Sequence, residues 1–121
     1  MKKNFVMVAG LFGFFGVALG AFGGHALKEI LSPEMLEIYK IGVQYHLIHA
    51  VVLLAIALSG KEFLQKSFVF FAVGILLFSF SLYAYVISGL KFLVFITPLG
   101  GTSFLIGWGL VIYQSWKQVK E

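Results

Sequence analysis

Residues 10–25 read GLFGFFGVALGAFGGH, an apolar stretch with far more glycine than an ordinary helix contains. On an α-helix, at about 100° per residue, a set of these glycines falls within a sector of roughly 80°. The set is Gly13, Gly16, Gly20 and Gly24. In lipid, small residues at this spacing let a second helix backbone approach closely. The stretch therefore predicts a membrane helix with a groove on one side, which packs either another helix of the same chain or a second copy.

The composition of the whole chain also indicates that the protein lies in a lipid bilayer. Of its 121 residues, 60% are hydrophobic and 12% are charged, whereas soluble domains are about half apolar and a quarter charged. A soluble fold of this length lacks the interior to bury so many apolar segments. The nine lysines are scattered between apolar runs and form no basic stripe, which argues against a nucleic-acid partner. We expect the lipid bilayer to be the main partner.

Four apolar segments predict four membrane-spanning helices in a single transmembrane domain over residues 1–121. The expected spans are about residues 4–24, 41–59, 67–88 and 92–116. About 20 apolar residues are enough for one helix to cross the hydrocarbon layer. A secretory signal is the alternative for the first span, but an apolar run of about 20 residues exceeds the core of such signals. The predicted fold is all-α, an integral membrane four-helix bundle.

The start of the last helix has two interpretations, because the sequence reads ITPLGG at residues 96–101. Thr97 and Pro98 can form a new helix start, or one helix can run from Phe92 and bend at Pro98. We favour a start at Pro98, because the residues from there to Trp116 already span about 28 Å. For the second helix, Ser32 and Pro33 predict an N-cap and a start at Pro33.

Lysines set the predicted orientation. Six lie in the N-terminal tail, the second loop and the C-terminal tail, and three lie in the first and third loops. The first group is Lys2, Lys3, Lys61, Lys66, Lys117 and Lys120, and the second is Lys28, Lys40 and Lys91. Because positive loops stay in the cytoplasm, we expect both termini to be cytoplasmic.

All three histidines lie between residues 25 and 49. His46 and His49 share one helix face, and His49 lies about 13 Å beyond Lys40, near the middle of the bilayer. Ionisable residues at that depth usually face the bundle interior. They either form a metal or proton site or are neutral imidazoles hydrogen-bonded between helices. We favour the second interpretation, with no metal and no cofactor, in a polar network of His25, Tyr45, His46, His49, Ser79, Ser81 and Thr97.

The sequence contains few residues that can carry catalysis. It has no cysteine and no aspartate, and its glutamates lie in predicted loops or tails. Paired carboxylates, a phosphate-binding loop and a dinucleotide fingerprint are absent, so we do not expect an enzyme. Gly100 and Gly101 join the glycine set of the first span as predicted helix-packing positions.

Four ordered blocks of the sequence carry a family resemblance. They are GAFGGHALK (20–28), YHLIHA (45–50), FSFSLY (78–83) and ITPLGG (96–101), the last followed by Gly107-Trp108. Together they resemble the domain of unknown function 423 family of small bacterial membrane proteins, which is similar to the eukaryotic transmembrane protein 256 group. The resemblance implies a multi-pass protein of the bacterial cytoplasmic membrane and supplies no catalytic residue.

These observations favour a non-enzymatic integral membrane protein of structural or accessory type, alone, as a homo-oligomer or with a membrane-protein partner. The alternative is a small transporter or channel for a small solute or ion, which the mid-membrane histidines and the interrupted last helix favour. A third hypothesis is a metal- or haem-binding subunit of a membrane complex.

Overall fold

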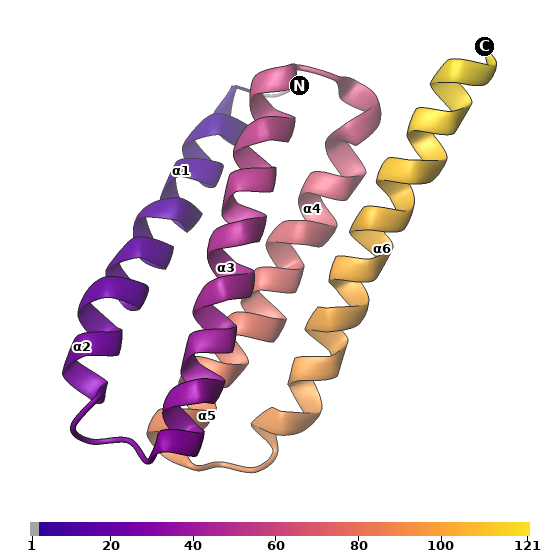
Figure 1. The fold of residues 1–121 in the computed structure, drawn as a ribbon. Helices are drawn as coiled ribbons and strands as arrows, with labels where there is room; N and C mark the ends of the chain where they lie inside the picture. Colours follow the sequence, from indigo (N-terminus) through magenta and orange to yellow (C-terminus); the bar gives the residue numbers. More distant parts are fainter. Residues whose placement is uncertain (1–2) are drawn as a thin grey trace.

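The computed structural model describes residues 3–121, and every regular element in that part of the chain is helical (Figure 1). The elements are α1 (Asn4–Val17), η1 (Ala18–Gly23), α2 (Gly24–Leu27), α3 (Pro33–Ser59), η2 (Glu62–Leu64), α4 (Gln65–Gly74), η3 (Ile75–Ser79), α5 (Phe80–Ser88) and α6 (Leu93–Lys120). The segments η1 and η3 are π-helical turns that continue the neighbouring α-helices, and η2 is a 3₁₀ turn.

In the described residues these elements form four helices that are long and apolar enough to cross a membrane. They cover Asn4–Leu27, Pro33–Ser59, Glu62–Ser88 and Leu93–Lys120. Side chains such as Phe95 (79% exposed) and Leu105 (74% exposed) point outward from the bundle, as expected for a surface that faces lipid. The predicted all-α membrane bundle is confirmed.

The second membrane helix, α3, lies at the centre of the packing. Helix α1 packs against one side of it, and the continuous helix α4–η3–α5 packs against another. Helix α6 packs against α4–η3–α5. The fully buried apolar side chains come from the two central helices and include Leu53, Phe71 and Ile75. The core of the bundle is therefore built around α3 and α4–η3–α5.

Local sequence explains where α3 begins and where it ends. The Ser32 hydroxyl accepts a hydrogen bond from the Met35 amide at 3.2 Å, and Pro33 is the first helical residue, as the sequence predicts. The helix ends at Gly60, whose φ of 67° is a left-handed conformation that glycine adopts at no steric cost.

The favoured start of the last helix at Pro98 is wrong. Helix α6 begins at Leu93, and Pro98 lies inside it. Proline has no backbone N–H, so the helical hydrogen bond from residue 98 to the Val94 carbonyl is missing. The Thr97 hydroxyl lies 3.3 Å from the Leu93 carbonyl, and Gly100, less than one turn further on, is buried against η3. Tertiary packing of this turn therefore outweighs the loss of one helical hydrogen bond.

The glycines of the first span differ in what lies beside them. A Cβ added at Gly16 would lie 2.7 Å from a Leu47 methyl group, and one added at Gly20 would lie 2.8 Å from a Val43 methyl group. One added at Gly24 would only touch the Tyr39 ring at 4.0 Å. Gly13 differs from our expectation, because a Cβ there would meet nothing within 4 Å. The α1–α3 contact is therefore close at Gly16 and Gly20 and open beside Gly13.

We expect Gly20→Leu to lower the stability of the protein in detergent by about 1–3 kcal/mol, because the added side chain overlaps α3. Gly13→Leu is the matched control on the same helix, since open space lies beside it. Thermal unfolding followed by circular dichroism measures both. Equal unfolding midpoints for the two variants would contradict the close contact at Gly20.

Helix α1 begins and α6 ends at the same end of the bundle (Figure 1). That this end is cytoplasmic stays a prediction from the lysine distribution, in which Lys2 lies outside the described residues. A reporter enzyme that works only outside the cytoplasm, fused after Glu121, is expected to be inactive. The same reporter inserted at Gly89, at the other end of the bundle, is the positive control. An active fusion after Glu121 would reverse the orientation.

Candidate functional site

His46, on α3, is completely buried and bonded to two other spans. Its Nε2 lies 2.8 Å from the Phe12 carbonyl oxygen on α1, and its Nδ1 lies 2.8 Å from the Tyr83 hydroxyl on α5. A carbonyl can only accept, so Nε2 carries a proton. Because complete burial disfavours a charged imidazole, we assign the neutral form, in which Nδ1 accepts from the Tyr83 hydroxyl. The two nitrogens of His46 thus join three membrane helices.

His49, one turn further along α3, is 5% exposed and has the opposite tautomer. Its Nδ1 donates to the Tyr45 carbonyl at 2.8 Å, and its Nε2 accepts from the indole N–H of Trp108 at 3.2 Å. The imidazole also stacks on Phe104, with ring centroids 3.8 Å apart and planes 12° from parallel. His49 therefore ties α3 to α6 through one hydrogen bond and one ring stack.

The two imidazoles use all their nitrogens within the protein. A metal ion binds the lone pair of a neutral imidazole nitrogen, and the Nδ1 of His46 and the Nε2 of His49 already accept hydrogen bonds. Within residues 3–121 there is no group of three or more His, Cys, Asp or Glu side chains that could hold a metal ion. The arrangement can bind helices together, but it presents no free imidazole lone pair for coordination chemistry.

Hydroxyl groups make a separate connection between α5 and α6. Ser81 Oγ lies 2.6 Å from Thr97 Oγ1, so one hydroxyl donates to the other. Ser81 Oγ also lies 2.8 Å from the carbonyl oxygen of Phe78, one turn earlier. Ser79 Oγ is buried and, in the described part of the chain, has no hydrogen-bond partner. The backbone carbonyl oxygen of the same residue lies 3.4 Å from where a Cβ on Gly42 of α3 would be.

The predicted network is therefore not a single cluster. His46, His49 and the Ser81–Thr97 pair bond to different partners. His25, which we expected in the interior, is exposed at the end of α2, because the first span reaches the bundle end there. Tyr45 is 41% exposed, and it contacts His49 through its backbone carbonyl and its ring.

Sequence reasoning missed several groups that hold the helices together. The Tyr39 hydroxyl donates to the Leu19 carbonyl within η1. On α6, the Gly107 carbonyl accepts from Ser67 at 3.0 Å, and Ser103 donates to the Phe70 carbonyl at 2.7 Å. The contact between α4 and α6 could have been predicted from the sequence. Small residues at positions 100, 103 and 107 lie on one face of α6 and allow a neighbouring helix to pack closely there.

Comparison with known proteins places the chain among bacterial membrane proteins. The family described as "Protein of unknown function (DUF423)" matches residues 19–101. A "UPF0382 membrane protein" of Haemophilus influenzae is 43% identical over 120 residues, covering 97% of this chain and 97% of the relative. The "UPF0382 inner membrane protein YgdD" of Escherichia coli K12 is 37% identical and covers 93% of this chain and 89% of the relative.

A third relative is the "UPF0382 membrane protein YwdK" of Bacillus subtilis, which is 35% identical and covers 95% of this chain and 98% of the relative. No solved structure matches the chain. Both the match over residues 19–101 and these nearly full-length similarities lead to the same assignment. The chain belongs to the DUF423 family of bacterial membrane proteins.

Proposed function

We propose that this protein is a non-enzymatic integral membrane protein of structural or accessory type. The observation that carries the proposal is the state of the two buried histidines. In both, the N–H donates to a carbonyl and the other nitrogen accepts from a hydroxyl or an indole. Groups with all their hydrogen bonds made inside the bundle stabilise one helix arrangement and offer nothing to a passing solute.

Proton or metal transport would require these contacts to break. If His46 takes up a proton at Nδ1, the Tyr83 hydroxyl has to turn from donor to acceptor, which leaves its own buried proton without a partner. To bind a metal ion through Nε2, His49 must release the indole N–H of Trp108. The packing around both rings therefore favours a fixed structural role over a transport cycle.

A transporter or channel for a small solute or ion is the second candidate, and one observation favours it. Ser79 Oγ is fully buried and unpartnered in the described residues, at the end of the π-helical turn η3. Single π-helical turns inside α-helices frequently occur at functional sites. A solute with a hydrogen-bonding group would satisfy this hydroxyl.

Purified protein in liposomes tests the proposal against this candidate. Vesicles with a pH-sensitive dye inside, and separately vesicles loaded with potassium or sodium, are compared with protein-free vesicles after a gradient is imposed. We expect the same leak rates with and without protein. A protein-dependent flux that Ser79→Ala abolishes, while the exposed Ser88→Ala control retains it, would replace the proposal with the transporter.

A further inference from the structure

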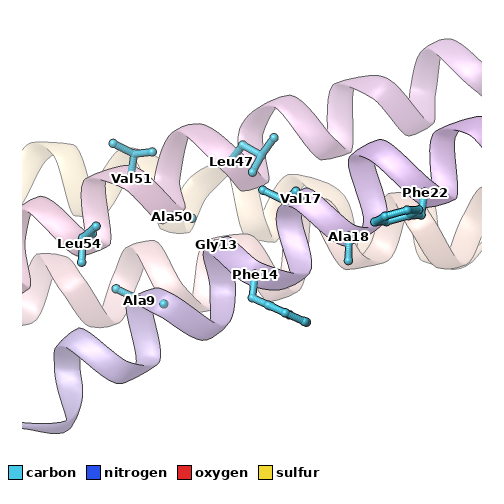
Figure 2. Close-up of a pocket in the computed structure, with 11 residues that line it drawn as sticks. Ala9, Gly13, Phe14, Val17, Ala18, Phe22, Leu47, Ala50, Val51 and Leu54 are labelled. Atoms are coloured by element: carbon cyan, nitrogen blue, oxygen red, sulfur yellow. The ribbon is translucent and has the colours of Figure 1, made fainter.

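An apolar groove runs between α1 and α3 on the outside of the bundle, with a volume of about 550 Å³ (Figure 2). Its floor includes Gly13 and Ala50, and Phe14, Val17 and Val51 form its sides. A Cβ added at Gly10 or Gly13 would meet nothing within 4 Å. In the described part of the protein these two glycines therefore border open space. Beside Gly16 and Gly20, by contrast, side chains of α3 occupy the space that a Cβ would need.

A second depression, of about 410 Å³, lies between α2 and the start of α3. The residues that line it include His25, Lys28, Lys40 and Gln44, and no carboxylate is among them. Lys40 pairs with Glu37 at 3.8 Å, but both side chains are more than half exposed, at 61% and 72%. Such an exposed pair is weak, so the Lys40 ammonium remains available to an anion.

The two depressions lie on the same side of α3. Their α3 residues follow one another at helical spacing of three or four, from Leu36 and Lys40 through Val43 and Leu47 to Val51 and Leu54. On the first span, Gly20 and Gly24 line the polar depression, and Ala18 and Phe22 line the apolar one. The two depressions therefore follow one another along α1 and α3, polar and basic at the loop end and apolar toward the middle of the membrane, and we name the pair the α1–α3 groove.

The length of the whole groove matches one leaflet with its headgroup. From Lys40 to Leu54 the helix rises about 21 Å, and one half of a bilayer that is about 40–45 Å thick with its headgroups is about 21 Å. Lys28 and Lys40 line the polar end, where the lipid phosphates of that leaflet are expected. The groove thus has the dimensions and the polarity of one phospholipid molecule standing in one leaflet.

We propose that this groove binds a glycerophospholipid, with its phosphate held by Lys28 and Lys40 and an acyl chain lying over Gly13 and Ala50. The inference goes beyond the proposed function and does not depend on it. A second copy of the chain is a poorer occupant, because a symmetric pair on this face would bring the two sets of lysines together. An anionic phosphate is complementary to them.

The test compares two lipids that share their acyl chains, dioleoylphosphatidylglycerol and dioleoylglycerol, which lacks the phosphate. Native mass spectrometry of the detergent-purified full chain measures how much of each lipid stays bound. We expect wild type to retain the phospholipid and not the diacylglycerol. Gly13→Leu fills the apolar part without a clash, so it is expected to reduce retained phospholipid at least threefold at an unchanged unfolding midpoint.

The paired change of Lys28→Gln with Lys40→Gln tests the phosphate end. A lysine near anionic lipid contributes about a fivefold change in affinity, so the pair is expected to weaken binding about 25-fold. Gly109→Leu, also in open space but on α6, and the pair Lys61→Gln with Lys66→Gln are the matched controls, expected to behave as wild type.

Three results would overturn the inference. The first is equal retention of both lipids by wild type, which means that the lysines do not recognise a phosphate. The second is equal loss of phospholipid in Gly13→Leu and Gly109→Leu, which means that only the general lipid shell is measured. The third is a change of oligomeric state in Gly13→Leu with no change in bound lipid, which assigns the groove to a second copy.

Discussion

Gly100→Ala is expected to produce one of the two largest losses of stability that a single substitution causes in this protein. A Cβ at Gly100 would lie 2.6 Å from the Leu77 carbonyl carbon and 2.6 Å from the Phe78 Cα. Both atoms belong to the backbone of η3 and cannot rotate aside, so α6 has to move away from the third span. We expect a cost of about 3 kcal/mol, at the upper end for overpacking, measured by thermal unfolding in detergent.

The neighbouring residue provides the control. A Cβ at Gly101 would lie 3.9 Å from the Phe78 ring, an ordinary van der Waals distance. Gly101→Ala changes the same chemical group on the same turn of α6, so it corrects for any general effect on helix stability. We expect it to unfold at the wild-type temperature or slightly above it, because alanine favours the helix more than glycine does. If Gly100→Ala and Gly101→Ala unfold together, α6 does not pack as closely on η3 as described.

The sequence predicts the fold well because the bilayer restricts the choices. Backbone groups in hydrocarbon must bond within their own segment, so four apolar runs of sufficient length become four helices. Capping residues then set details such as the start of α3 at Pro33. The start of α6 was mispredicted, because the proline penalty is local while the contacts that outweigh it, at Gly100, come from η3.

The site is less predictable because side-chain partners depend on rotation and register. The shared face of His46 and His49 follows from their spacing, but their partners Phe12, Tyr83 and Trp108 lie on three other helices. The π-helical turns η1 and η3 each change the helical phase of the residues after them. A helix face assigned at 3.6 residues per turn therefore cannot be carried unchanged across such a turn.

His46→Leu is expected to destabilise the protein by about 2–4 kcal/mol, because it leaves the buried Tyr83 hydroxyl without its acceptor. It also removes the donor to the Phe12 carbonyl. Tyr83→Phe alone should cost about 1–3 kcal/mol, since it leaves the His46 Nδ1 unpaired. Thermal unfolding in detergent, with denaturant titration where it is reversible, measures each variant.

The double variant, His46→Leu with Tyr83→Phe, separates a hydrogen bond from simple packing. With both polar partners replaced by apolar groups, no unpaired group remains between them, so we expect the double variant to be more stable than the sum of the two single losses predicts, by about 1–3 kcal/mol. Ser88→Ala, which changes an exposed hydroxyl on α5, controls for the effect of losing any hydroxyl on that helix. Additive losses would mean that the His46–Tyr83 hydrogen bond adds nothing to stability beyond the packing of the two rings. The structural role of the His46 imidazole would then depend on its hydrogen bond to the Phe12 carbonyl alone.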